Sequence, residues 1–269
     1  MGARFATAAP MLTLGAMRPL ALVTGASSGI GLEIARLLAP DHDLVLVARR
    51  RERLEALNRE LGGRHQVVDL DLAVPGADLA LFARVPSCDV LINDAGVGIY
   101  GDLVQNDVGR VAALIELNVR TPTLLARRYV AGMIERGRGA ILNVASAAAL
   151  NAEPGMAVYA ASKAYLLSFS EALHHEVKGR GVSVTCLLPG PTETEFTETA
   201  GVRQALRVEP PRWLFAPPDR VARIGVEAMR KGQISATAGA TSLVAVAGSR
   251  LLPRRTVAWV TGRILSKGR

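Results

Sequence analysis

Aromatic residues are scarce in this chain. Phe, Trp and Tyr make up 4% of its 269 residues, whereas hydrophobic residues make up 49%. The core therefore has to be built from Ala, Val, Leu and Ile, as in parallel sheets that are covered by helices. The length fits one large α/β domain and leaves no room for two full-sized domains.

Cysteine is almost absent as well. Cys88 and Cys186 lie in two separate apolar runs, which excludes a disulfide framework and indicates reduced thiols. We therefore expect an intracellular protein in the cytoplasm.

Basic residues exceed acidic residues but form no block. The formal net charge is +8, and most of the basic residues are Arg scattered through helical segments. The chain lacks the Lys/Arg runs interleaved with aromatics that bind single-stranded nucleic acid. Nucleic acid is not expected as a partner.

The two ends of the chain differ in composition from the middle. Residues 1–18 lack the features of a signal peptide or a myristoylation signal, and we expect a flexible extension. Residues 240–269 alternate apolar stretches with Arg and Lys and are too interrupted to span a bilayer. Two interpretations of this tail stay open: peripheral membrane contact through interfacial helices on anionic lipid, or an interface between subunits.

Seven short apolar runs alternate with helical patterns between residues 19 and 239. The runs are LALVTG, DLVLVAR, HQVVDL, CDVLIND, GAILNVAS, VSVTCLLPG and QISATAG, and helical segments between them include 30–38, 51–61, 107–135 and 157–177. This alternation predicts right-handed βαβ crossovers and a doubly wound parallel α/β sheet of about seven strands in a single domain. Ligands of such folds bind outside the carboxyl ends of the strands.

The stretch TGASSGIG, residues 24–31, follows the first run and opens the first helical segment. Glycines at that place allow a tight turn and a close approach of the backbone to a pyrophosphate. The amide N–H groups and the helix N-terminus then meet the phosphate charge. The placement predicts dinucleotide binding.

Tyr159 and Lys163 lie one helical turn apart in YAASK. Positions i and i+4 share one helix face, so the phenol and the ammonium can point into the same volume. Taken alone, such a pair more often marks an amphipathic helix edge with both polar tips in water.

The glycine spacing TGxxxGxG, followed by YxxxK, resembles the short-chain dehydrogenases/reductases, from about residue 19 to about residue 239. Further motifs in the family's order are NDAG at 93–96, LNV with Asn118, NVAS ending at Ser146, and PGPTET at 189–194. The family usually has NNAG, so Asp94 departs from its pattern. The resemblance implies a Rossmann-type fold and an oxidoreductase.

The resemblance also implies that Asn118, Ser146, Tyr159 and Lys163 are catalytic. Carbonyl reduction needs a hydride from nicotinamide and a proton for the developing alkoxide, and Tyr159 is the expected proton donor. Lys163 is expected to hold the nicotinamide ribose and, together with the oxidised nicotinamide, to lower the pKa of Tyr159. Ser146 is expected to hold the substrate oxygen, although it also fits a turn cap.

Pro122 lacks the N–H that would bond the carbonyl of Asn118 four residues earlier. A freed buried carbonyl needs a partner. We expect an ordered water that links Asn118 to Lys163 as a proton path, as in the family. A proline kink with a solvated Asn is the alternative.

The motifs imply a set of cofactor-binding residues and no metal ligand. This set is Gly25, Ser27, Ser28, Gly29, Ile30, Gly31, Arg49, Arg50, Asp71, Leu72, Asn93, Ala95, Gly96, Tyr159, Lys163, Pro189, Gly190, Thr192 and Thr194. Asp71 is preferred as the acidic residue that faces the adenine, and Asp69 stays open as the alternative.

The end of the second strand favours NADP(H). A carboxylate there would accept hydrogen bonds from the adenosine ribose and repel a 2′-phosphate, but the chain has Ala48 followed by Arg49 and Arg50. Guanidinium groups bind phosphate through charge-assisted bonds. We expect NADP(H) in preference to NAD(H), with Arg49 carrying most of the preference and Ser27 assisting.

Residues 195–218 contain Phe196, Trp213, Phe215 and four prolines, and in the family this region covers the substrate. An apolar cover predicts an apolar ketone, aldehyde or alcohol as substrate. The sequence thus predicts an NADP(H)-dependent carbonyl/alcohol oxidoreductase, and the resemblance implies a homodimer or homotetramer. A dinucleotide-binding regulator with little or no turnover is the alternative.

Overall fold

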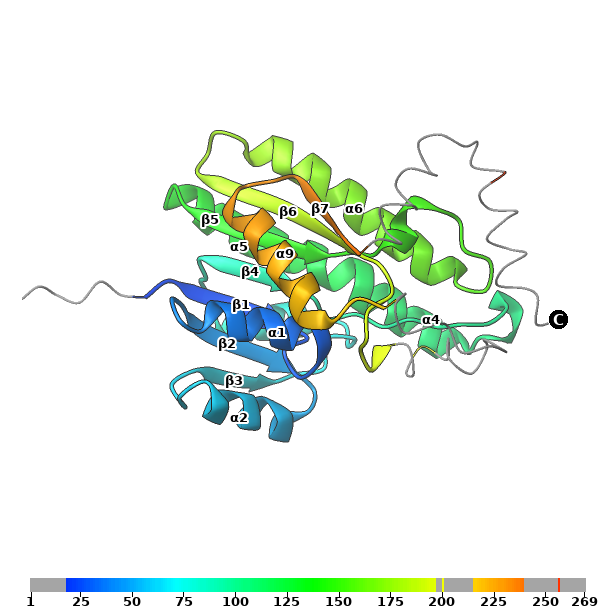
Figure 1. Ribbon diagram of the computed structural model, residues 1–269, viewed down its shortest axis with the longest axis horizontal. Helices are drawn as coiled ribbons and strands as arrows, with labels where there is room; N and C mark the ends of the chain where they lie inside the picture. The colour runs from blue at the N-terminus through cyan, green and yellow to red at the C-terminus, as the bar shows by residue number, and fades with distance from the viewer. Residues whose placement is uncertain (1–17, 197–199, 201–214, 240–255, 257–269) are drawn as a thin grey trace, which may run out of the picture.

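The computed structural model describes residues 18–196, 200, 215–239 and 256 (Figure 1). Its seven strands are β1 (Leu20–Thr24), β2 (Asp43–Ala48), β3 (Gln66–Asp69), β4 (Val90–Asn93), β5 (Gly139–Val144), β6 (Val182–Pro189) and β7 (Ser235–Ala238). Each strand falls in one of the seven predicted runs, so the prediction of the strands is confirmed. The predicted N-terminal extension up to residue 17, most of the predicted substrate cover and nearly all of the C-terminal tail lie outside the described residues.

The strands form one parallel sheet in the order β3-β2-β1-β4-β5-β6-β7. The strand order reverses between β1 and β4, where Thr24 lies beside Asn93. Doubly wound sheets bind their ligands at this reversal. The prediction of a Rossmann-type α/β fold is confirmed.

Helices cover both faces of the sheet (Figure 1). They are α1 (Gly29–Leu38), α2 (Arg51–Glu60), α3 (Ala77–Arg84), α4 (Val108–Ile115), α5 (Thr121–Glu135), α6 (Ala157–Val177) and α9 (Pro218–Arg230), with short 3-10 turns η1 (Leu103–Gln105) and η3 (Ala147–Leu150). Helices α3 and α9 are not among the helical segments named from the sequence.

Two aliphatic cores lie on the two faces of the sheet. On one face, α1 and α9 pack Ile34, Leu38 and Val221 against β1, β4 and β5. On the other face, α3 and α5 bury Leu81 and Leu125. The first core contains no aromatic ring, and the second contains Tyr129, with Phe82 and Phe169 packed against it.

The segment 107–135, predicted as one helix, is interrupted by a π-helical turn η2 (Glu116–Arg120) between α4 and α5. The N–H of Thr121 bonds the carbonyl of Glu116, five residues earlier, and Pro122 has no N–H. Neither the carbonyl of Leu117 nor the carbonyl of Asn118 can therefore accept a hydrogen bond from residue 122. The predicted break at Asn118 takes the form of a π turn, which frequently marks functional sites.

Within the described residues, no helix is both long enough and apolar enough to cross a membrane.

His65, just before β3, is buried with only one of its ring nitrogens satisfied. Its Nδ1 accepts the N–H of Leu44 at 3.1 Å, and its Nε2 has no partner among the residues that the structure describes. Burial, and next the charge of Arg64, hold the pKa of His65 below its usual value. The ring is therefore neutral in the folded protein near neutral pH.

We expect protonation of His65 to destabilise the fold. The folded-state pKa lies below the unfolded value of about 6.5, so the stability of the neutral ring is lost as the pH falls below that value. In His65→Asn, an amide oxygen can replace Nδ1 as acceptor and cannot be protonated. Between pH 7.5 and 5.5, the Tm of His65→Asn should fall less than the Tm of the wild type. His175→Asn, at an exposed position, serves as the control, and equal slopes for wild type and His65→Asn would contradict the prediction.

Candidate functional site

Two segments meet at the carboxyl edge of the sheet, where β1 and β4 end. The hydroxyl of Thr24 donates to the carbonyl of Ile92 at 3.0 Å and accepts the N–H groups of Asp94 at 3.1 Å and Ala95 at 3.2 Å. Thr24 is fully buried. One side chain thus fixes the glycine loop (residues 24–31) against the NDAG segment, although the sequence analysis quoted Thr24 only as part of a motif.

The glycine loop is packed too closely for side chains. Gly25 has φ +75°, and a Cβ there would lie 2.9 Å from the nitrogen of Ala95. A Cβ at Gly31 would lie 2.5 Å from Oδ2 of Asp94 and 2.7 Å from the carbonyl oxygen of Gly25. Helix α1 starts at Gly29 and Ile30, so its first N–H groups point out of this bare turn. The cradle fits a phosphate at a helix N-terminus.

Asp94, the departure from the family's motif, lies beneath the glycine loop. Burial raises its pKa to about 7, while the charge of Lys163 and the N–H of Gly31 act in the opposite direction. A carboxyl group in this place changes its charge near neutral pH. From the sequence, Asp94 is only a departure from the family's motif; its surroundings come from a loop some sixty residues away in the chain, which a local pattern does not report.

Tyr159 and Lys163 lie on the inner side of α6, and both are buried, at 7% and 5% exposure. The Nζ of Lys163 lies 5.9 Å from the centre of the Tyr159 ring and donates to the carbonyl of Val144 at 2.9 Å. The alternative in which both polar tips lie in water is therefore wrong.

The protonation of this pair is set mainly by burial. Burial raises the pKa of Tyr159 to about 12; the Ser146 hydroxyl lowers it, and Glu153 and Asp94 raise it. Burial lowers the pKa of Lys163 to about 8, against the opposite effect of Asp94. Without cofactor the phenol is neutral, and the expected acidification of Tyr159 stays a prediction for the complex.

Ser146 follows β5 directly. Its Oγ accepts the N–H of Ala148 at 3.1 Å and so caps η3. The same hydroxyl also hydrogen-bonds the Tyr159 phenol and lowers its pKa. The turn-cap interpretation and the proposed role beside Tyr159 are therefore compatible in one side chain.

Asn118 is buried in the π turn with its amide fully used. Its Oδ1 accepts the N–H of Val97 at 3.0 Å, and its Nδ2 donates to the carbonyl of Val97 at 2.9 Å and to Oγ of Ser162 at 3.1 Å. The solvated-Asn alternative is wrong. A Cβ at Gly96 would lie 3.3 Å from both Oδ1 of Asn118 and Nζ of Lys163. These two side chains therefore converge on Gly96, which has no side chain of its own. The water that would link them stays a prediction.

The two arginines after β2 point in different directions. Arg50 donates from Nη2 to Oγ of Ser27 at 3.2 Å and to Oγ of Ser28 at 3.0 Å. Arg49 is 68% exposed and lies 4.0 Å from Asp71. The contacts with the glycine loop thus favour Arg50 over Arg49 as the residue next to a cofactor phosphate. The sequence predicts that Arg49 carries most of the cofactor preference.

Several other predicted cofactor residues hold the loops of this edge together. Asn93 turns its amide into the sheet, where Nδ2 donates to Oδ1 of Asn143 at 2.9 Å. The carbonyl of Leu72 accepts from the hydroxyl of Thr121 at 2.9 Å. The Asp71 carboxylate accepts the N–H of Ala73 at 3.0 Å. Asp69 lies 3.4 Å from Arg51, and the choice between Asp69 and Asp71 stays open.

The PGPTET segment continues from β6 toward the glycine loop. Pro189 ends β6, Gly190 donates its N–H to the carbonyl of Ala238 at 2.9 Å, and the Thr192 hydroxyl donates to the carbonyl of Gly190 at 2.9 Å. The Thr194 methyl would lie 3.0 Å from a Cβ at Gly29. The segment therefore borders the phosphate cradle.

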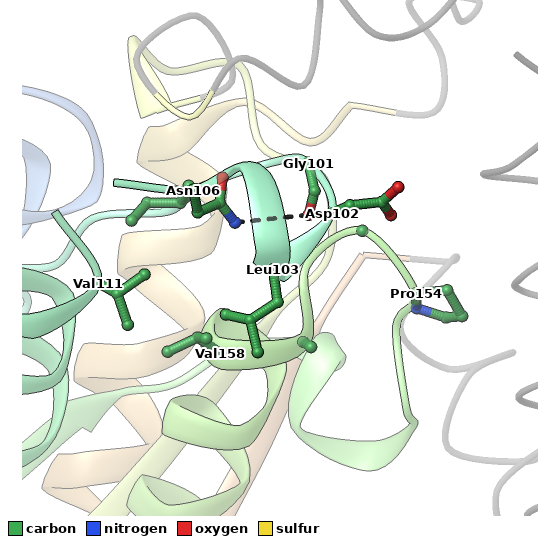
Figure 2. A pocket seen from close by; sticks show the side chains of 10 residues that line it. Gly101, Asp102, Leu103, Asn106, Val111, Pro154 and Val158 are labelled. Carbon is green, nitrogen blue, oxygen red and sulfur yellow. Dashed lines mark hydrogen bonds between the residues drawn. The ribbon is translucent and has the colours of Figure 1, made fainter. Parts of the chain in front are cut away.

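Apolar side chains surround the Tyr159 phenol. The Phe196 ring lies 5.2 Å from the Tyr159 ring, and Ile99 and Met156 belong to the same cluster. Beside this cluster, a cavity of about 300 Å³ is lined by the apolar residues Ile99, Leu103, Val111 and Val158 and by the polar residues Asp102 and Asn106 (Figure 2). In the described part of the chain, no three His, Cys, Asp or Glu side chains group as a metal site would require.

Burial of Asp94 should cost stability at high pH. Its folded-state pKa lies above the ordinary value of about 3.9, so the native state holds this proton more tightly than the unfolded chain. The free energy of unfolding then falls as the pH rises from about 4 to about 7. Asp94→Asn removes the charge, and its Tm should exceed that of the wild type at pH 8 and by a smaller margin at pH 5. A margin that does not depend on pH would contradict this prediction.

Comparison with known proteins agrees with this geometry. A family model described as short chain dehydrogenase matches residues 19–205. The chain is 39% identical over 190 residues to sulfoacetaldehyde reductase of Chromohalobacter salexigens, covering 67% of this chain and 75% of that protein. It is 34% identical over 189 residues to Nodulation protein G of a Rhizobium species, covering 68% and 77%.

Among solved structures, a short-chain dehydrogenase from Sphingobium yanoikuyae in complex with NADPH superposes with a TM-score of 0.75. It is 32% identical and the match covers 86% of this chain and 93% of that one. The chain therefore belongs to the short-chain dehydrogenase family of oxidoreductases.

Proposed function

We propose that this protein is an NADP(H)-dependent oxidoreductase that interconverts a carbonyl and an alcohol on a small apolar molecule. The observation that carries the proposal is the buried pair of Tyr159 and Lys163 on one face of α6, with Ser146 acting on the same phenol. A protein that only binds a dinucleotide has no need of a buried proton donor beside a titrating ammonium.

The chain's own residues would handle the proton. The bound nicotinamide supplies or accepts the hydride. In the reducing direction, Tyr159 donates its phenolic proton to the carbonyl oxygen, and Ser146 donates a hydrogen bond to that oxygen as its charge develops. Lys163 stabilises the resulting tyrosinate, and a proton that enters along the proposed route from Asn118 through Lys163 restores the phenol. The π turn supports this route, because it interrupts the regular helical hydrogen bonds at Asn118 and Pro122 cannot donate to the Asn118 carbonyl.

The cofactor preference rests on the end of β2. The bare glycine loop fits a pyrophosphate, and Arg50 lies on Ser27 and Ser28 of that loop. A 2′-phosphate in this place would meet the Arg50 guanidinium and two hydroxyl groups. The NADPH bound to the Sphingobium relative supports the same assignment.

An apolar substrate agrees with the walls of the site, where Phe196, Ile99 and Met156 surround Tyr159. A homodimer or homotetramer agrees with the exposed apolar side chains Leu103, Val104, Val108 and Ile115 on η1 and α4. A cytoplasmic location and the membrane or subunit contact of the tail stay predictions from the sequence.

Tyr159→Phe tests the assignment of the proton donor. We expect at least about a 100-fold lower kcat with an unchanged NADPH Kd, because only the transferable proton is removed. NADPH consumption with a panel of apolar ketones and aldehydes measures the former, and fluorescence titration measures the latter. Retention of more than about a tenth of the wild-type kcat, a loss of under about 1.4 kcal/mol, would contradict the assignment. A wild type that binds NADPH but turns over no member of the panel would favour the regulator instead.

Arg50→Ala tests the cofactor assignment. NADPH should raise the Tm of the wild type more than NADH at the same concentration, since a ligand stabilises the native state according to its affinity. In Arg50→Ala this difference should shrink, while Arg49→Ala should keep most of it. Equal stabilisation by the two cofactors would contradict the NADP(H) preference, and the opposite result for the two variants would return the role to Arg49.

A further inference from the structure

Glu195 reaches from the segment after β6 to the arginines that follow β2. Its Oε2 accepts from Nη1 of Arg50 at 2.7 Å, and its Oε1 lies 2.5 Å from Nη1 of Arg53. The two partners lie 145 and 142 positions away in the sequence. The carboxylate therefore bridges two separate parts of the site.

The bridge occupies the same guanidinium that contacts the glycine loop. Arg50 donates from Nη1 to the Glu195 carboxylate and from Nη2 to the hydroxyls of Ser27 and Ser28. A 2′-phosphate beside these two hydroxyls would need the donors that Glu195 now uses. The carboxylate thus uses one of the two terminal nitrogens of the guanidinium group that the proposed function assigns to the phosphate.

The other charged groups at this end of β2 are engaged elsewhere. Arg49 lies near Asp71, and Arg51 donates to Glu55 at 2.7 Å and lies 3.4 Å from Asp69. Arg50 and Arg53 are therefore the cations of this described region that face Glu195.

The Glu195 carboxylate is charged and pairs with Arg50 and Arg53 at neutral pH, but these ion pairs are weak enough for another anion to replace them. Hydrogen bonds from Arg50 and then Arg53 hold the pKa of Glu195 below its usual value, so the carboxylate is charged at neutral pH. All three side chains are more than two fifths exposed, and ion pairs that water reaches contribute little net stability. One carboxylate balances only one of the two guanidinium charges, whereas a phosphate monoester brings up to two.

We propose that Glu195 is a determinant of cofactor specificity, whose carboxylate competes with the 2′-phosphate of NADP(H) for Arg50 and Arg53. The proposal rests on the proposed function. NAD(H) has no 2′-phosphate and leaves the bridge in place. The competition therefore lowers the affinity for NADP(H) and narrows its advantage over NAD(H).

Fluorescence titration of the full chain with NADPH and with NADH tests the competition. Glu195→Gln keeps the shape of the side chain and removes its charge. We expect the Kd for NADPH to fall about threefold to tenfold, the size of one or two exposed ion pairs, and the Kd for NADH to change by less than about twofold. Glu193→Gln is the matched control, because Glu193 is exposed in the same segment and no ion pair joins it to Arg50 or Arg53.

Each other outcome overturns the proposal. An unchanged or larger NADPH Kd in Glu195→Gln would mean that the bridge positions Arg50 for the phosphate or has no effect. A weaker NADH complex alone would make Glu195 an acceptor for the ribose hydroxyls. An equal gain for Glu193→Gln would reduce the effect to net charge. If the wild type bound both cofactors but Glu195→Gln did not bind NADPH more tightly, only the role of Glu195 would be refuted and the proposed function would stand. A wild type that bound neither cofactor would refute both the role of Glu195 and the proposed function.

Discussion

The hydroxyl of Thr24 holds the site together. It makes three hydrogen bonds at the point where the strand order reverses, and two of them are to consecutive N–H groups of the NDAG segment. Those N–H groups lie beyond the end of β4, where no neighbouring strand could pair with them, and a buried N–H without a partner is costly. The position of the glycine loop, of Asp94 and of Gly96 beside Lys163 follows from this one anchor.

The side of the site that holds Tyr159 and Lys163 also depends on burial. Tyr159 and Lys163 are buried and Asp94 is half-buried, and the pKa of each of the three groups is shifted in the direction that favours its neutral form. The three groups also act on one another, since Asp94 raises the pKa of both Tyr159 and Lys163. A family member with Asn at this position has no such acidic neighbour, so the charge of this site is set differently here.

The seven strands could be predicted because a buried parallel strand leaves a local mark, a short run of β-branched and aliphatic residues. The Tyr159 and Lys163 pair could be predicted because i,i+4 spacing is also local. The type of helix break was not predictable. Pro122 indicates that one helical hydrogen bond is lost, but the packing around Asn118 decides whether the helix kinks or forms a π turn. The direction of Arg50 and its bridge to Glu195 depend on segments far apart in sequence, which no local pattern reports.

The π turn also takes up one extra residue between α4 and α5 without rotating α5 away from its contacts. An α-helix advances about 100° per residue, so one extra residue would turn everything after it away from its contacts unless the extra residue were absorbed locally. Here η2 absorbs it, and α4 and α5 both keep their apolar stripes on the protein interior, with Leu114 before the turn and Leu125 after it. Deleting one residue from η2 would therefore leave a choice between a regular helix with a misplaced α5 and a strained loop. The chain length between LNV and the core of α5 is consequently as constrained as the identity of Asn118 itself.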